Sequence, residues 1–297
     1  MPEDGYLQQS TSAPGESSQP AFSRTGYARL EAGLSPAGKS FLRRQDVCYP
    51  FHICRPFYFD GDPNGMATVY LQSCAGGIFD GDDLRQSVSL EANTGLHVTT
   101  QASTIVHETP GCGAEQVTEL RAAAGCFLEY LPDPLILFPG VRLKTRLAVE
   151  LDPDAVAILA DSFLCHDPSE QGKAFDSLFS ETKITITGKG LVALDRFAIT
   201  GSDLQARLVG ANGPYIAQGS MVILPGRAAI DPLLNDLQAQ LADYPGTYAM
   251  ASRLSRDAGI WLRILARDAV ALRRVQRMVW ITARRILVGR EPAVRSK

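Results

Sequence analysis

Three carboxylates lie within four positions of this chain, directly after a pair of glycines. The segment reads Gly76-Gly77-Ile78-Phe79-Asp80-Gly81-Asp82-Asp83. Glycines allow the tight turn, and acids packed this closely repel one another unless they are solvated, paired with cations or bound to a metal ion. The spacing does not fit an EF-hand loop. Two interpretations stay open here, namely a solvated turn capped by aspartates and a metal-dependent hydrolase that uses the Asp80–Asp83 cluster.

Four further acids stand in apolar surroundings. Glu129 and Asp133 belong to the block Leu128-Glu-Tyr-Leu-Pro-Asp-Pro134, Asp161 follows the apolar run 155–160, and Asp195 precedes Arg196. A buried carboxylate is costly unless it is paired or belongs to a site. Asp195 and its neighbour also fit a simple charge step on an edge strand.

A run of neutral polar side chains, Thr99-Thr100-Gln101-Ala102-Ser103-Thr104, closes one predicted strand. Hydroxyls and amides of this size suit a polar channel, and they equally suit a well-paired strand end. The four histidines are scattered, and no Cys-x-x-Cys pair occurs. The sequence therefore predicts no tightly bound metal. The common nucleotide, hydrolase and metalloprotease motifs are absent as well, and we predict no catalytic residues.

The elements that must position these residues are mainly strands. Short alternating or β-rich segments, broken by Gly, Pro, Asn and Asp, recur at 67–72, 86–91, 95–100, 116–121, 126–131, 145–151 and 183–187. Many short strands with this spacing predict a large, mainly β, layered and solenoid-like body. The run 155–160 fits a buried strand or a short helix.

The last third of the chain has a different pattern. A helix is predicted from Asp231, then two strands over 247–254 and 259–266, and a final helix capped by Asp268. In that helix Leu272, Val275, Val279, Thr282 and Ile286 share one face. Its arginines, placed on the other faces, predict an interface or a solvated surface. The predicted organisation is a disordered tail over 1–24, a β-rich body over 25–225, a small α/β lobe over 226–290 and a tail over 291–297.

The bulk properties are those of an ordinary globular protein. The chain has 297 residues, 45% hydrophobic and 21% charged residues and a net charge of -3. This balance gives no case for nucleic acid. No apolar run is long enough to cross a membrane, and the N-terminus lacks the pattern of a signal peptide, so we expect a cytoplasmic protein.

Four blocks in this order resemble the UreD (UreH) family of urease accessory proteins. They are Arg55-Pro56-Phe57-Tyr58, the Gly-Gly-x-x-x-Gly-Asp segment ending at Asp82, Thr99-Thr100-Gln101, and Glu129 to Pro134. The resemblance implies a mostly β fold and a role outside catalysis, namely helping nickel into the urease apoprotein. It implies UreF-like and UreG-like accessory proteins and the urease apoprotein as partners, with neither nucleic acid nor membrane.

The resemblance also implies which residues line an internal polar path for Ni2+ in transit. We expect Asp82, Asp161 and Asp195 to contact the ion transiently, and Thr104, Glu129 and Asp133 to line the path. The chain departs from the family pattern at three positions, which carry Ile105, His107 and His166. Besides the hydrolase, a second alternative stays open, in which the chain is a scaffold without any ion path.

Overall fold

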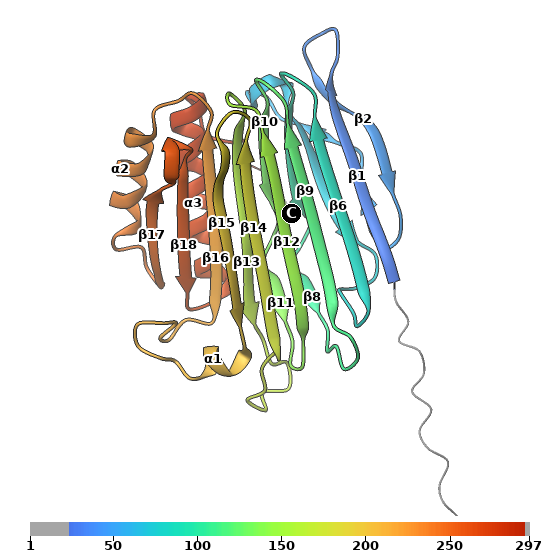
Figure 1. The fold of residues 1–297 in the computed structure, drawn as a ribbon, viewed down its shortest axis with the longest axis vertical. Coiled ribbons are helices and arrows are strands. Elements are labelled where there is room, and N and C mark those ends of the chain that lie inside the picture. The colour runs from blue at the N-terminus through green and yellow to red at the C-terminus, as the bar shows by residue number, and fades with distance from the viewer. Residues whose placement is uncertain (1–23, 295–297) are drawn as a thin grey trace, which may run out of the picture.

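The chain builds two β-sheets that face each other, with two long helices packed on the outer side of one sheet (Figure 1). The computed structural model describes residues 24–294, so the predicted tail over 1–24 lies outside the described residues except for Arg24. Of the predicted C-terminal tail, residues 291–294 are described and have no regular secondary structure.

Sheet A is the front layer in Figure 1 and has the order β15-β14-β12-β9-β6-β1-β2. Its strands β1, β6, β9, β12 and β14 run parallel, whereas β2 and β15 pair antiparallel at the two edges. The strand bounds are β1 Arg24–Leu34, β2 Ser40–Val47, β6 Asp82–Leu90, β9 Ala114–Ala122, β12 Arg142–Leu151, β14 Ser177–Ile186 and β15 Gly190–Ile199.

Sheet B has the order β17-β18-β16-β13-β10-β7-β5-β3, with β4, β8 and β11 attached beside it. Its bounds are β3 Phe51–Ile53, β4 Phe57–Tyr58, β5 Ala67–Ser73, β7 Gly95–Thr100, β8 Thr104–Val106, β10 Phe127–Leu131, β11 Leu135–Leu137, β13 Val156–Cys165, β16 Ala217–Pro225, β17 Thr247–Arg253 and β18 Ile260–Ala266. The helices are α1 Gly201–Gln205, α2 Ile230–Leu241 and α3 Ala269–Val288, with single 3-10 turns at Pro63–Gly65 and Ser255–Asp257.

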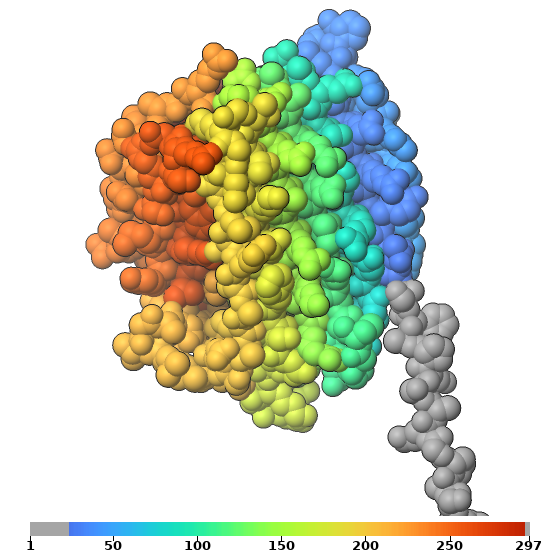
Figure 2. Space-filling view, viewed as in Figure 1, coloured from blue at the N-terminus to red at the C-terminus, as the bar shows by residue number. Residues whose placement is uncertain are grey.

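The path of the chain through the two sheets is solenoid-like. From β5 to β14 the long strands alternate between sheet B and sheet A, so that each sheet is built from successive parallel strands. Figure 2 shows this order as bands of colour that follow one another across the face of the molecule. The predicted mainly β, solenoid-like fold is confirmed.

Apolar side chains fill both interfaces of sheet B. Two separate clusters lie between the sheets, one around Leu120 and Leu159 and the other around Leu143 and Phe163. A third cluster lies between sheet B and the helices α2 and α3. Because successive strand residues point to opposite faces, each strand of sheet B can supply side chains to both interfaces.

The C-terminal segment contains the helix, two strands and helix that the sequence predicts. Both strands, however, are hydrogen-bonded into sheet B, since β18 pairs with β16. Asp268 caps α3 through a 2.7 Å hydrogen bond from the backbone N–H of Ala271. The ambiguous run 155–160 lies in strand β13, where its β-branched and apolar residues are buried on both faces of the sheet.

Candidate functional site

A band of polar side chains crosses the interior between the two apolar clusters, and we call it the polar belt. Sheet A supplies two rows of it, because in-register parallel strands place equivalent residues side by side. Sheet B supplies the facing side. The polar belt consists of Gln86, Thr118, Thr182 and Asp195 in one row, which the apolar Leu147 interrupts between Thr118 and Thr182, Gln116, Thr145 and Ser180 in the other, and Tyr130, Asp161 and Ser220 from sheet B.

Hydrogen bonds within the polar belt run between the sheets. The hydroxyl of Tyr130 donates to Gln86 Oε1 over 2.9 Å and lies 3.4 Å from the hydroxyl of Thr118. Ser180 Oγ donates to Asp161 Oδ2 over 3.3 Å. A cavity of about 70 Å³ opens here, which is large enough for ordered water. The interior of this sandwich is therefore polar at one level and has room for water there.

Asp161 is a half-buried carboxylate inside the sandwich that has no cation in contact with it. Burial raises its pKa, and the hydrogen bonds from Ser180 and from the backbone N–H of Ser162 offset this only in part. Among residues 24–294 no Lys, Arg or His side chain lies within ion-pair distance of it. Ser180 and the backbone can orient the carboxylate, but they cannot neutralise it. Such a group gains free energy when a passing cation contacts it.

Further cavities adjoin the polar belt on either side. On one side, Thr104 and Thr100 line both the inner cavity and an outer groove of about 370 Å³, which also contacts Gly76 and Gly77. On the other side, Asp161 borders a constriction of about 10 Å³ beside Trp261. A separate groove of about 600 Å³ is lined by Asp195 and Arg263, and Arg263 contacts Ser220 of the constriction. Thr104 and Asp161 thus lie on cavities that share lining residues, and the groove of Asp195 is linked to them through Arg263.

The three acids of the Gly-Gly turn do not share a site. Asp80 accepts hydrogen bonds from the backbone N–H groups of Gly111 and Gly113, at 2.9 and 2.8 Å. Asp83 pairs with Arg85 on the same strand. Because each acid has its own partner, the cluster that the hydrolase alternative needs is not assembled.

Asp82 is buried and forms an ion pair with Arg24, whose guanidinium lies between the rings of Tyr49 and Phe79. Its carboxylate also accepts the backbone N–H of Phe79 over 2.9 Å. Arg24 in turn donates to the carbonyl of Gly77 over 3.4 Å. These contacts hold the turn that borders the outer groove, and Asp82 itself does not line the cavities described above.

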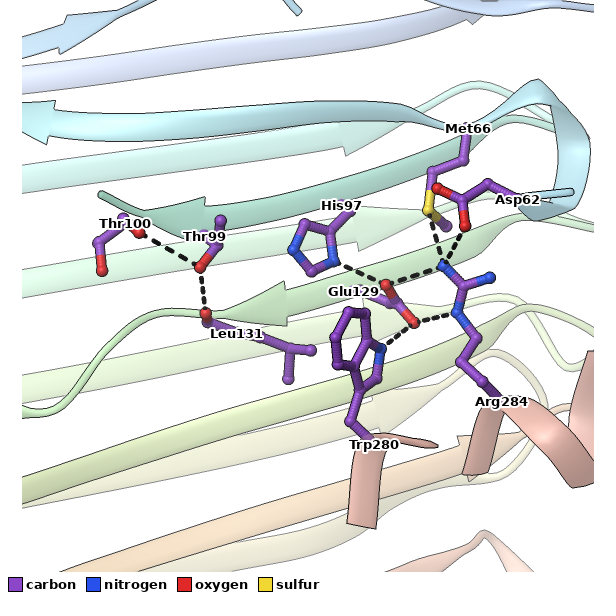
Figure 3. Close-up of polar contacts among 9 residues, drawn as sticks. All are labelled: Asp62, Met66, His97, Thr99, Thr100, Glu129, Leu131, Trp280 and Arg284. Carbon is purple, nitrogen blue, oxygen red and sulfur yellow. Dashed lines mark hydrogen bonds and ion pairs between the residues drawn. The ribbon is translucent and has the colours of Figure 1, made fainter. Parts of the chain in front are cut away.

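Glu129 faces away from the polar belt, toward α3, in a second buried polar group that we call the ionic cluster (Figure 3). Arg284 Nε donates to Glu129 Oε1 over 2.6 Å, and Trp280 Nε1 donates to the same oxygen over 2.7 Å. His97 Nδ1 lies 2.7 Å from Glu129 Oε2. Arg284 Nη2 also donates to Asp62 Oδ1 over 3.0 Å.

The ionic cluster is closed to solvent. The side chains of Glu129 and Arg284 are both 0% exposed. Burial alone would raise the pKa of Glu129, but the hydrogen bond and charge of His97, together with Arg284, outweigh it and lower the pKa to about 2. Glu129 is therefore ionised and fully partnered. Its neighbour in sequence, Asp133, lines the inner cavity and lies 3.6 Å from Arg273 of α3.

The sequence missed the cation of the ionic cluster. The helical pattern predicts that Arg284 lies with the other arginines on an interface or solvated face of the last helix. This prediction is wrong, because the side chain of Arg284 is fully buried. The helical period indicated only the apolar face around Leu272 and Val279. A carboxylate inside an apolar strand, such as Glu129, was the available signal that a buried cation had to exist.

Two negative findings concern residues 24–294. Across these residues, no group of three or more His, Cys, Asp and Glu side chains is placed to hold one metal ion together. Within the same range, none of the helices combines the length and the apolar character needed to cross a membrane.

Comparison with known proteins agrees with the four sequence blocks. The family model described as UreD urease accessory protein matches residues 24–296. Urease accessory protein UreD 1 of Pseudomonas syringae pv. syringae (strain B728a) is 38% identical over 282 residues, covering 95% of this chain and 99% of that protein. UreD 3 of Bradyrhizobium sp. (strain ORS 278) is 38% identical over 82% of this chain and 86% of its own length. UreD 1 of Methylorubrum extorquens (strain PA1) is 38% identical over 88% and 87%. The chain belongs to the UreD family of urease accessory proteins.

Proposed function

We propose that this chain gives Ni2+ a buried polar path on the way to the urease apoprotein. The observation that carries the proposal is Asp161, a half-buried carboxylate with no cation within ion-pair distance, in a cavity that hydroxyls and amides help to line. A cation entering the cavity would offset the cost of that burial by about 4 kcal/mol per unit-charge pair at roughly 4 Å and an effective dielectric constant of about 20. Oxygen ligands of this kind allow an ion to enter and leave again.

The proposed path uses three of the residues that the sequence nominated. Thr104 lies at the outer groove, Asp161 at the centre and Asp195 at the opposite groove. We assign Asp82 to holding the Gly-Gly turn at the groove through Arg24. Asp133 borders the inner cavity beside Arg273, and Glu129 lies outside the path.

We further propose that the chain acts in the cytoplasm without catalysing a reaction, as a bridge between urease and UreF-like and UreG-like partners. The names of its relatives support a part in urease maturation. The partners themselves follow from the family resemblance. The Asp80–Asp83 hydrolase is not carried further, since those acids have separate partners.

Nickel loading of urease tests the path. The chain is co-expressed with urease and the other accessory proteins, in cells lacking their own copy of this gene, as wild type, Asp161→Asn or Asp161→Ala. We expect several-fold less nickel per urease by metal analysis, with unchanged recovery of the accessory complex by affinity purification. Asp243→Asn, which changes an exposed acid on the surface, is the matched control.

A second variant separates the path from a plain scaffold. Ser180→Leu places a larger apolar side chain beside Asp161 and keeps every charge. A blocked path predicts low nickel in urease with an intact complex. Normal loading in both Ser180→Leu and Asp161→Asn would mean that nickel reaches urease outside this chain, and the scaffold alternative would then stand.

A further inference from the structure

The last step of the proposed path lies where sheet B extends beyond the edge of sheet A. Strands β17 and β18 continue past β15, the edge strand of sheet A (Figure 1). In sheet B, Asp161 pairs with Ser220 on β16, and Ser220 pairs with Arg263 on β18. These three residues therefore form one row that leads from the interior carboxylate of Asp161 to the open edge.

Arg263 closes the space between the two sheets at this edge. One guanidinium nitrogen forms an ion pair with Asp195 of sheet A, and Nη1 donates to Ser220 Oγ over 3.2 Å. The guanidinium carbon lies 5.4 Å from the centre of the Trp261 ring. The side chain thus contacts both sheets and the aromatic wall between them.

The cavities narrow at the same place. The constriction on the side of Asp161 that faces the groove of Asp195 measures about 10 Å³ and is lined by Ser220 and Trp261, both of which contact Arg263. That volume is at the lower limit for a single water molecule, about 10–15 Å³. Arg263 and Asp195 line the groove outside it. The observed arrangement is a closed outlet with a cation across it.

We propose that Arg263 is an electrostatic gate for the outlet of the path, a role that rests on the proposed nickel path. In the closed state its guanidinium neutralises Asp195 and repels a divalent cation at the constriction. When it moves away, Asp195 is free to contact the ion that leaves Asp161. Arg263 is 44% exposed, so solvent is available to the moving side chain, and ion pairs with this exposure are weak.

A gate and an ion-binding residue give opposite predictions for the rate of nickel loading. Removing the gate should raise the rate, whereas removing a residue that binds Ni2+ should lower it. Arg263→Gln removes the charge from the outlet and keeps a polar side chain. At limiting nickel, we expect the initial rate of urease loading by the full accessory complex to rise at least twofold. Arg263→Lys, which retains a cation, should stay near the wild-type rate. A matched control is Arg121→Gln, since Arg121 is an exposed arginine of sheet A that pairs with Glu150 and lines none of these cavities.

Ser220→Ala is a milder second variant, in case Arg263→Gln does not fold. It removes only the hydrogen bond that holds the guanidinium at the constriction, and we expect a smaller increase in the same direction. The gate is overturned if Arg263→Gln leaves the complex intact and the loading rate is unchanged or reduced. If Arg263→Gln does not fold, an unchanged or reduced rate in Ser220→Ala overturns it instead.

Asp161→Asn in the same assay separates the gate from the path. A loss of loading in Asp161→Asn together with no rate increase in Arg263→Gln rejects the gate alone. Full loading in both Asp161→Asn and Ser180→Leu rejects the path, and the gate with it.

Discussion

Glu129 and Asp161 are interior carboxylates on neighbouring strands of one sheet, but Glu129 is fully buried and Asp161 is half-buried, and their partners differ as well. Glu129 points to the helix side of β10, where Arg284, His97 and Trp280 surround it. Asp161 points to the inter-sheet side of β13, where its side-chain partner is the hydroxyl of Ser180. The pKa of the first is lowered to about 2, and that of the second is raised.

Under the proposed path, this difference means that the two faces of one sheet separate a structural role from a transport role. A carboxylate with a built-in cation holds two elements together and has little affinity left for another ion. A carboxylate with only neutral hydrogen-bond donors lowers the stability of the fold but keeps its charge available. The two faces of sheet B therefore carry opposite solutions to the same electrostatic problem.

Among these substitutions, removal of the Arg284 side chain should lower the free energy of unfolding the most, because it breaks the ionic cluster around Glu129. Arg284→Ala leaves Glu129 and Asp62 buried with no arginine between them. Breaking such a pair typically costs about 3–5 kcal/mol, and urea unfolding followed by circular dichroism measures it. Arg274→Ala, at an exposed position on the same helix, should change the free energy of unfolding by less than about 0.5 kcal/mol. Equal effects of the two substitutions would show that the ionic cluster does not hold α3.

Acid should weaken the same cluster in a defined range. Because the folded-state pKa of Glu129 lies below the ordinary value of 4.5, its contribution to stability is present above about pH 4.5 and is lost as the pH falls toward about 2. The loss is on the order of 3 kcal/mol for this shift. Urea unfolding between pH 6 and pH 3 should show a steeper decline in wild type than in Glu129→Gln. Parallel pH curves would contradict the assigned ion pair.

For Asp161, the dependence of stability on pH has the opposite sign. Asp161 has a raised pKa, so its ionisation in the folded state costs stability as the pH rises above its unfolded-state value. Asp161→Asn should therefore raise the free energy of unfolding at pH 7, by about 0.5–2 kcal/mol, while nickel loading falls. Thermal unfolding at pH 7 and at pH 4 tests this, because the gain should shrink in acid. A loss of stability at pH 7 would mean that Asp161 has a partner that compensates its charge.

The smallest change in the free energy of unfolding is expected for the exposed ion pair between α3 and the segment after β10. Arg273 is 50% exposed and lies 3.6 Å from Asp133. Exposed pairs of this kind contribute about 0–1 kcal/mol. Arg273→Ala should therefore cost far less than Arg284→Ala in the same unfolding assay. A cost of similar size would mean that burial does not decide the strength of these pairs.

Much of the fold could be predicted because local patterns carry it. Alternation predicted the strands around residues 86–91 and 116–121, and Asp268 marked the start of α3. The inward direction of Asp161 was not written in the sequence, since residues 155–160 are apolar throughout and give no period. Which strand lies beside which depends on long-range pairing, for which the chain has no local signal.

The two charged partners, Arg284 and Arg263, could not be predicted for related reasons. α3 buries a second face, and that face is made of Trp280, Arg284 and their neighbours rather than of a hydrophobic stripe. A hydrophobic period of 3.6 residues therefore marks only one of its two contacts. Arg263 and Asp195 are 68 positions apart in the sequence, and they lie on β18 and β15, which belong to different sheets. No local pattern therefore indicates that they form a pair.

The in-register pairing of β6, β9, β12 and β14 limits how this family can vary in length. One residue inserted within β12 would turn Thr145 away from Gln116 and Ser180 and would bring an outward-facing neighbour into their row. An insertion in the connection before or after the strand would leave that row intact. Evolutionary gains and losses of residues should therefore accumulate at the two ends of the sandwich, and this freedom explains why a stacked architecture has no recognisable repeat in its sequence.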